Sequence, residues 1–523
     1  MDEQEKIERR AHIRLIITEA LMFLAVLFLV GFLTLIVMGY SFNLRELGGS
    51  GEVLERSGLV QISSLPTGAT IYIDGEAPLL LSTNASRTML AGEHEISLAK
   101  GGFDGWKKTI RVTEGMMYRL NYPRLFKEER ETEEVMRFYK PAKAEDRIDK
   151  TDEEDAVKTY AGKISFVRVS PNNERMLIML DGMLYLMNLN DNKPALKTLE
   201  IPNMDSVDIV KVATIESAEW SGNSERMLAL INGEWAVLNV RDSKDTFWVN
   251  KVIKKNDIRD IKFESEIGDR LLILNTAGEL VELNIKDGKL SEVLVDGVDK
   301  FDNDGDRVVY LTKFNSETRE NVLAGESTPR DSEWQVRAYR VGDSESYVIR
   351  RFELEQGEEL GSVRVATMRY FQEGYVGIAH GVDFEVYSKT GWMTSDDEME
   401  KVFSEKESFD IAKIRKRGKG MVFEMVGSDG DTVVFDIEAM ATARVDTKDT
   451  GWIDEFMRFR LIDGKLSVLD YDGLNERVLV KSKVMSGRVV AISGNGRYLY
   501  YFSDATKNTE DGMREVLVRE RIN

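Results

Sequence analysis

The strongest constraint on the fold is an internal repeat that begins after residue 160. The segments RMLIMLDGMLYLMNL (175–189), RMLALINGEWAVLNV (226–240) and RLLILNTAGELVELNI (270–285) each predict an apolar strand, a tight turn and a second apolar strand. Asp181-Gly182 and Asn232-Gly233 favour two-residue hairpins. Each hairpin follows a further short strand, so the repeating unit is built from several strands that pack on both faces.

Weaker copies continue to the end of the sequence and set the expected architecture. Four-stranded units repeated every 40 to 50 residues are typical of a β-propeller. We therefore expect a mainly β protein with a propeller over residues 156–523, of eight blades, or seven if one weak unit is an insertion. The segment AVKTYAG (156–162) is expected to pair with the last unit and close the ring. The units begin near residues 164, 215, 258, 298, 362, 409, 451 and 485.

One segment near the N-terminus is long and apolar enough to cross a membrane. Residues 21–38 carry no charge, and the wider span 16–40 would form a helix of roughly 37 Å against a hydrocarbon core of about 30 Å. A cleaved signal peptide is the alternative, but its apolar region is usually shorter and ends in a small-residue cleavage site. We expect an uncleaved transmembrane helix at 16–40.

The basic residues around this helix predict its orientation. Four of them precede it and fewer follow closely, which favours a cytoplasmic tail at 1–15 and an extracytoplasmic remainder. The preceding residues are Lys6, Arg9, Arg10 and Arg14, and the following ones are Arg45 and Arg56. A linker at 41–58, which contains GGSG at 48–51, is expected to be a flexible spacer.

Residues 59–123 predict a small β unit of short strands joined at glycines. Val60 and Ile62 begin it, and Ala69, Ile71 and Ile73 alternate with polar residues before the turn at 74–75. Further alternation follows at 95–98 and 110–112, and Phe103 and Trp106 are expected to anchor the core.

This block resembles a PEGA domain, a β-sandwich module of surface and membrane-attached bacterial proteins. The matching features are the Pro66–Ala69 step, Asp74-Gly75, Gly92-Glu93-His94 and the Lys100–Phe103 turn. The chain departs from the pattern at Thr67 and in APLLLSTNASRTM (77–89). The resemblance implies a fold and no catalytic residue, and His94 is expected to be packed or solvated rather than a ligand. The propeller repeats resemble TolB-like or WD-repeat-like propellers in general form.

The residues between these two parts, 124–155, are dense in charge. EERETEEVMRF (128–138) predicts a short helix with acidic residues in its first turn. We expect the whole segment to be a solvated connector, with a recognition tail as the alternative.

The sequence offers little catalytic or metal-binding chemistry. There is no cysteine, and the histidines are His12, His94 and His380. FDNDGD (301–306) and DYDG (470–473) hold acidic residues but do not fit a calcium loop, so both are expected to be turns between strands. A net charge of -20 disfavours nucleic acid. We predict no catalytic, cofactor-binding or metal-binding residues and no cofactor.

These observations favour a membrane-anchored, extracytoplasmic binding or scaffold protein of the bacterial cell surface, not an enzyme. Its expected partners are the lipid bilayer, through residues 16–40, and a surface protein or cell-wall glycan. The alternative is a carbohydrate-active propeller enzyme that uses paired carboxylates. A sensor is disfavoured because a tail of 15 residues is short for a signalling domain.

Overall fold

The computed structural model divides into two compact units, residues 1–128 and 129–523. The propeller unit therefore begins earlier than the expected boundary at residue 156. The expected spacer at 48–51 and the second half of the connector (140–155) lie outside the described residues. Those described are 3–37, 40–42, 54–77, 81–139, 157–204, 213–313, 333–343, 345–353, 363–390, 399–417, 420–446, 450–481, 483–504 and 514–523.

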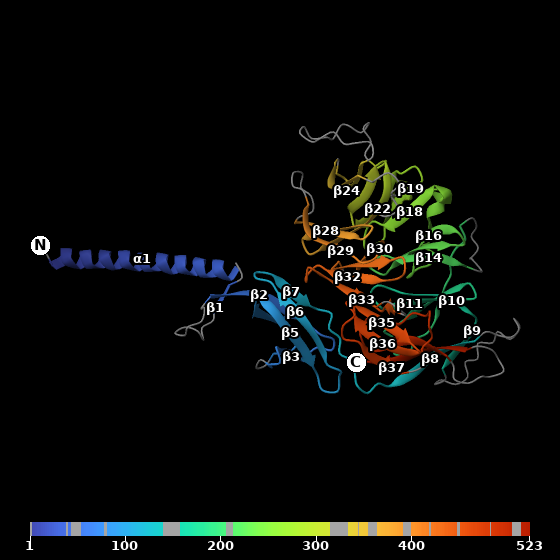
Figure 1. Ribbon diagram of the computed structural model, residues 1–523, viewed down its shortest axis with the longest axis horizontal. Helices are drawn as coiled ribbons and strands as arrows, with labels where there is room; N and C mark the ends of the chain where they lie inside the picture. Colours follow the sequence, from blue (N-terminus) through green and yellow to red (C-terminus); the bar gives the residue numbers. More distant parts are fainter. Residues whose placement is uncertain are drawn as a thin grey trace. The chain divides into compact units, whose positions relative to one another are not determined.

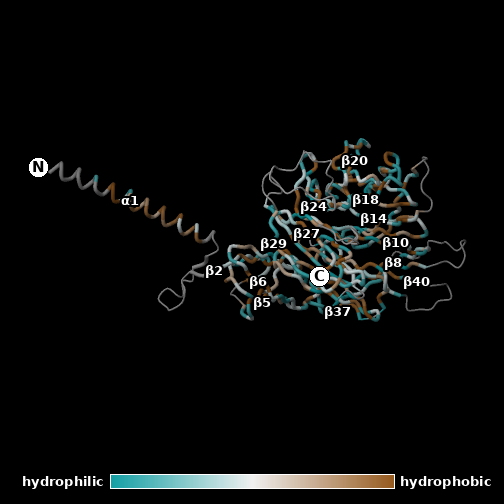
Figure 2. Tube along the Cα trace, turned by 45° about the horizontal axis from the view of Figure 1, so that its top comes forward, coloured by the Kyte–Doolittle hydropathy of each residue, from teal (hydrophilic) through white to brown (hydrophobic). Residues whose placement is uncertain are grey.

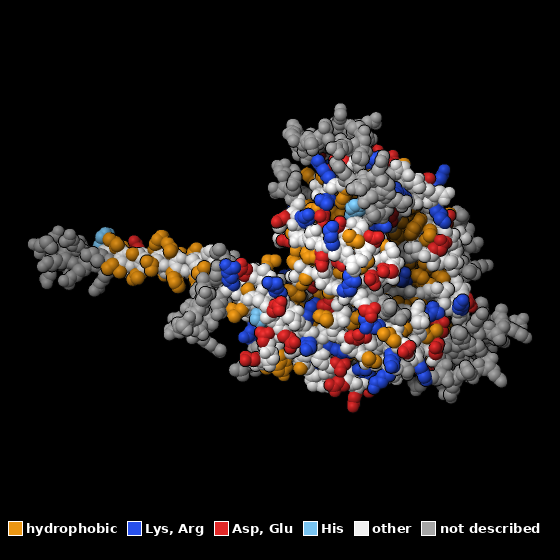
Figure 3. All heavy atoms as spheres, in the orientation of Figure 1, with side chains coloured by type: hydrophobic (Ala, Val, Ile, Leu, Met, Phe, Trp, Pro, Cys, Tyr) orange, Lys and Arg blue, Asp and Glu red, His pale blue; other side chains and the backbone are white. Residues whose placement is uncertain are grey.

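Helix α1 (Glu3–Val37) contains the apolar segment. Its window Leu15–Leu35 has a mean hydropathy of 2.5 and no part of it is buried by the chain. Its 21 residues span roughly 31 Å, which matches a hydrocarbon core of about 30 Å. Figure 2 shows hydrophobic residues along the described part of this helix, and Figure 3 shows their side chains. The described helix ends at Val37, and strand β1 (Tyr40–Phe42) is the next described element.

The rest of the first unit is a pair of small sheets. One contains β1, β2 (Leu54–Ile62), β4 (Ala85–Leu90) and β7 (Met117–Leu120), and the other contains β3 (Thr70–Ile73), β5 (Gly92–Ala99) and β6 (Trp106–Val112). Val60, Ile71 and Trp106 are buried, as the alternation predicts. Phe103 is only half-buried, so of the two expected anchors Trp106 alone fills the core.

The second unit is a β-propeller whose sheets succeed one another along the chain (Figure 1). We number them sheets 1 to 8. Sheet 1 contains β10 (Ile164–Val169), β11 (Arg175–Leu180), β12 (Met183–Asn188) and β13 (Lys197–Leu199). Sheet 2 contains β14 (Ile215–Trp220), β15 (Arg226–Ile231), β16 (Glu234–Asn239) and β17 (Phe247–Trp248). Sheet 3 contains β18 (Ile258–Phe263), β19 (Arg270–Asn275), β20 (Leu280–Asn284) and β21 (Lys289–Leu290). The short helices η3 (Val249–Lys251) and η4 (Lys255–Asp257) join sheets 2 and 3.

Sheets 4 to 7 keep the same order of four antiparallel strands. Sheet 4 contains β22 (Val298–Asp304), β23 (Arg307–Lys313), β24 (Glu333–Arg340) and β25 (Ser346–Glu353), and sheet 5 contains β26 (Val363–Tyr370), β27 (Glu373–His380), β28 (Asp383–Thr390) and β29 (Glu400–Lys406). Sheet 6 contains β30 (Ile411–Arg417), β31 (Val422–Gly427), β32 (Thr432–Asp436) and β33 (Ala441–Val445). Sheet 7 contains β34 (Thr450–Trp452), β35 (Met457–Ile462), β36 (Lys465–Asp470) and β37 (Arg477–Val480).

The first strand of several sheets has the same irregularity near its start. The register shifts between the first and third residues of β10, β14, β18, β22 and β30, which are the pairs Ile164/Phe166, Ile215/Ser217, Ile258/Asp260, Val298/Lys300 and Ile411/Lys413. A β-bulge re-aims the side chains that follow it. The repeat therefore extends to backbone detail, and the polar residues after each bulge share one orientation relative to their sheet.

Apolar clusters between neighbouring sheets make the core. Separate buried clusters join sheets 1 and 2, 2 and 3, 3 and 4, 4 and 5, and 5 and 6. Sheets 6 and 7 meet through the Tyr471 hydroxyl, which donates to Asp436. Arg130, just before β8, donates to the carbonyl of Leu479 in sheet 7 over 2.8 Å. A last cluster joins sheet 8 to sheet 1, so the sheets form a closed ring.

Sheet 8 closes the ring with residues from both ends of the unit. It contains β38 (Ala491–Ile492), β39 (Tyr498–Asp504), β40 (Arg514–Arg521), β8 (Thr132–Tyr139) and β9 (Lys158–Ala161), in that order. β8 pairs antiparallel with β40, and β9 pairs in parallel with β8. The expected direct pairing of residues 156–162 with the last unit is therefore wrong, because β8 lies between them.

The prediction of a short helix at 128–138 is also wrong, because Thr132–Tyr139 form strand β8 of this sheet. Met136 and Phe138 are buried and alternate with more exposed residues, which is strand periodicity. The acidic residues at 133 and 134 dominate the local composition and obscure this pattern. A tertiary partner, the edge of β40, decides the conformation of the segment.

Candidate functional site

The PEGA-like motifs meet at one turn of the first unit. Asp74 has a positive φ of 52°, and its carboxylate accepts hydrogen bonds from His94 Nδ1 at 2.7 Å and from the amide of Glu95 at 2.9 Å. His94 Nε2 lies 3.0 Å from the carbonyl oxygen of Leu90. The bond from His94 holds the pKa of Asp74 below its ordinary value, against the opposing effect of burial. These contacts give both residues a structural role within the turn.

Neither acidic motif of the propeller is a metal loop. In FDNDGD, Asp302 lies in β22 and pairs with Lys262, and Asp306 pairs with Arg340 at 2.8 Å. In DYDG, the Asp470 carboxylate accepts a hydrogen bond from the Asn475 amide at 2.8 Å. Each motif ends its strand and turns at a glycine with positive φ, as predicted. Among the described residues, no cluster of three or more acidic or histidine side chains could hold a metal ion.

A charged cluster links the first strands of four sheets. Lys262 Nζ lies 2.8 Å from Asp302 Oδ1 and donates to the carbonyl of Phe301 at 3.0 Å. The other Asp302 oxygen accepts the amide of Thr367 at 2.9 Å. From sheet 6, Lys416 donates to the carbonyl of Asn303. We call Glu219, Asp260, Lys262, Asp302 and Lys416 the inner-strand cluster.

Two carboxyl groups of this cluster have pKa values that are shifted in opposite directions. Burial opposes ionisation of Asp302, but Lys262 and Lys416 hold its pKa below the ordinary value. Burial raises the pKa of Glu219, although Lys262 opposes the shift. Glu219 nevertheless keeps accessible surface. Crowding together with exposure is the combination expected for a side chain in the central channel of a propeller. The cluster thus holds one carboxyl group whose pKa is raised and one whose pKa is lowered.

A second polar concavity lies between sheets 4 and 5. It has a volume of about 270 Å³, and its lining includes Arg350, Phe352, His380 and Glu385. Arg350 Nε and Lys401 Nζ each lie 3.1 Å from Glu385, and the Tyr387 hydroxyl donates to the same carboxylate at 2.9 Å. Its volume would admit a small polar ligand, just below the usual size of ligand pockets.

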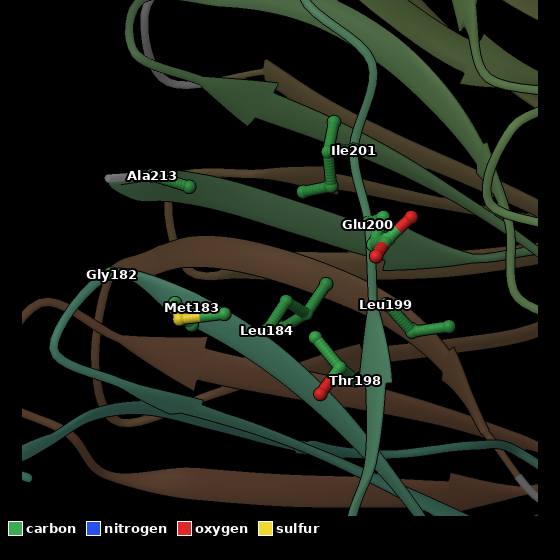
Figure 4. Close-up of a pocket in the computed structure, with 8 residues that line it drawn as sticks. All are labelled: Gly182, Met183, Leu184, Thr198, Leu199, Glu200, Ile201 and Ala213. Carbon is green, nitrogen blue, oxygen red and sulfur yellow. The ribbon is translucent and has the colours of Figure 1, made fainter. Parts of the chain in front are cut away.

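The cavity in Figure 4 is much smaller. It lies beside β12 and β13, and its volume of about 30 Å³ is room for a water molecule or two. Leu184, Leu199 and Ile201 supply apolar side chains to its lining. We assign no binding role to it.

Of the polar residues in the two propeller sites, sequence reasoning had named only Asp302, within the expected turn at 301–306, and His380. The charged positions of the inner-strand cluster are ordinary strand residues, and only the ring brings residues 219, 262, 302 and 416 together. The one available signal was the charge after each bulge position, in IRDIKF, VDKFDND and IAKIRKR. Strands that pack between neighbouring sheets favour apolar residues, so repeated charge on a first strand indicates a channel face.

Comparison with known protein families supports the PEGA prediction. Residues 57–125 match the PEGA domain family. The propeller is similar to the C-terminal WD40 domain of Sif2 (10% identity, TM-score 0.39, covering 75% of this chain and 96% of that one). It is also similar to an oligogalacturonate lyase from Vibrio parahaemolyticus (9%, 0.37, 69% and 98%) and to PorZ of Porphyromonas gingivalis (13%, 0.36, 67% and 42%). No curated protein matches the chain.

The chain thus combines one apolar helix, a PEGA domain and a β-propeller. This combination suggests a surface or binding scaffold. The predicted PEGA domain and propeller fold are confirmed.

Proposed function

We propose that this protein is a membrane-anchored scaffold whose propeller binds a partner outside the cytoplasm. The observation that carries the proposal is α1, whose apolar window has no protein contact to bury it. An exposed apolar surface of this length is costly in water and is accommodated by a bilayer. The helix stands before two independently compact β structures, which suits an anchor that holds binding domains at a surface.

The orientation that we propose for the chain in the membrane follows from the basic residues beside helix α1. The basic residues before the helix favour a cytoplasmic N-terminus, so the PEGA domain and propeller would lie outside. The partner we propose is a surface protein or a cell-wall glycan, since the negative net charge disfavours nucleic acid.

Protease protection tests the anchor and its orientation together. In intact cells whose outer layers admit the protease, added protease should remove the propeller, and alkaline washing should leave the full chain with the membrane. A propeller protected in intact cells but digested after lysis would overturn the orientation. Release of the full chain by the alkaline wash would overturn the anchor.

A second function has one specific observation in its favour. Glu219 and Asp302 belong to one cluster and have pKa values shifted in opposite directions, which is the usual division between a catalytic acid and an ionised partner. This arrangement supports a carbohydrate-active enzyme. Release of reducing ends from a panel of acidic glycans, abolished by Glu219→Gln, would establish it. Binding of a glycan without turnover would favour the scaffold.

A further inference from the structure

One strand of the propeller carries an unusual concentration of positive charge. In β30, Lys413, Arg415 and Arg417 alternate, so they share one face of the strand. They stand opposite Val426, Glu424 and Val422 of β31. The side chain of Arg415 is 42% exposed and that of Arg417 is 28% exposed, so both remain accessible. Lys413 lies close enough to Lys262 of the inner-strand cluster for their two charges to repel each other.

Three guanidinium groups converge on the single carboxylate of Glu424. Arg417 Nε lies 3.4 Å from Glu424 Oε2 and Arg415 Nη1 lies 3.9 Å from it, while Arg458 of sheet 7 bonds to Oε1. Among the ion pairs of the described chain, Glu424 is the only carboxylate that reaches any of these three arginines. The cluster therefore carries a surplus of positive charge, in a protein whose net charge is -20.

An aromatic ring holds two of these arginines in place. The guanidinium carbons of Arg458 and Arg417 lie 4.3 and 5.0 Å from the ring centre of Trp452, within cation–π range. The indole Nε1 donates to Glu424 at 2.8 Å. The positive groups are thus ordered before any ligand arrives, which lowers the entropic cost of binding.

The titration of these groups reflects their crowding. Burial lowers the pKa of Lys413 and of Arg415, and the charge of Arg417 adds to the shift, although Glu424 opposes it in both. Arg458 is almost fully buried, and its Nε finds no hydrogen-bond acceptor in the part of the chain that the structure describes. A buried donor without a partner is rare and calls for an explanation such as a ligand.

We propose that Lys413, Arg415 and Arg417 form a binding site for an oxyanion, with Arg458 and Trp452 supporting it from sheet 7. Guanidinium groups bind phosphate, sulfate or carboxylate through paired charge-assisted hydrogen bonds. The site would recognise an anionic group of a ligand at the propeller, such as a phosphate or an acidic sugar. It is independent of the membrane anchor, so failure of the proposed topology leaves it standing.

Titration of the detergent-solubilised full chain with inorganic phosphate tests the site. Phosphate should bind saturably and raise the melting temperature above that in chloride at equal ionic strength. The double variant Arg415→Gln/Arg417→Gln should weaken phosphate binding by about tenfold or more, since it removes two charge-assisted contacts. Lys413→Gln, at an exposed position, should weaken it less while keeping the fold.

Arg444→Gln is the matched control. Arg444 lies in the same sheet, is 54% exposed and pairs with Glu407 and Asp431, outside the cluster. This variant should bind phosphate like the wild type. Equal phosphate affinity in the double variant and the wild type, or no response beyond that of chloride, would overturn the proposal. A parallel titration with glucuronate distinguishes the source, since a stronger response to it would indicate an acidic sugar and a weaker one a phosphate group.

Discussion

Replacing Phe138 by alanine should destabilise the whole propeller unit, because this side chain seals the ring. Phe138 lies in β8, is 2% exposed and packs against Tyr160 and Phe502, with ring centroids 6.0 and 6.2 Å away. Phe→Ala at a buried site costs about 3–5 kcal/mol. The area buried by an aromatic side chain gives a similar value, about 4–6 kcal/mol. For a cooperative unit of the size of 129–523, about 4 kcal/mol lowers the melting temperature by about 5 °C.

Glu134→Ala, on the same strand, is the control. Glu134 forms a surface ion pair with Arg137, and both side chains are more than 40% exposed, so its loss should cost about 0–0.5 kcal/mol. Calorimetry of the two variants and the wild type measures the difference. Equal melting temperatures for the two variants would refute the assignment of β8 as the closing strand. Deletion of β9 should also destabilise the unit, because β9 pairs with β8 and its partly buried Tyr160 packs against Phe138.

Three further outcomes are expected. Asp74→Asn should destabilise the first unit at pH 7. Because folding lowers the pKa of Asp74, its contribution begins to shrink as the pH falls below about 4 and is lost once the carboxyl of the folded protein is protonated, so denaturant melts of variant and wild type should approach each other as the pH falls below about 4. Glu424→Gln should cost about 3–5 kcal/mol, since it leaves Arg458 buried without its partner, and phosphate should restore part of the loss in thermal melts. Lys262→Met should cost about 3 kcal/mol at neutral pH in denaturant titrations, and less below the lowered pKa of Asp302, where that carboxyl is neutral.

The sequence predicts the repeats well because each is a local pattern. Residues 175–189 contain an entire hairpin, so the strands β11 and β12 and their turn at Asp181-Gly182 need no distant information. The eight sheets of the described propeller begin at residues 164, 215, 258, 298, 363, 411, 450 and 491, within a few residues of the expected unit starts.

The closing strand could not be found in the same way. β8 carries two glutamates and pairs with residues almost 400 positions later, so its local composition resembles a solvated helix. Only two apolar residues, Met136 and Phe138, show the strand alternation, and a pattern this short does not stand out among the charged residues around it.

The sequence predicts the fold but not the candidate sites, and the polar residues of the inner-strand cluster show why. Lys262, Asp302 and Lys416 are chemically ordinary, and their meaning depends on which sheets stand next to one another around the ring. The inner-strand cluster and the arginines of β30 differ in how far nearby carboxylates balance their positive charge. In the inner-strand cluster each lysine meets a carboxylate, so that site is internally compensated and suits structural or acid–base roles. The arginines of β30 share one carboxylate, so this strand is where an added negative group would gain most.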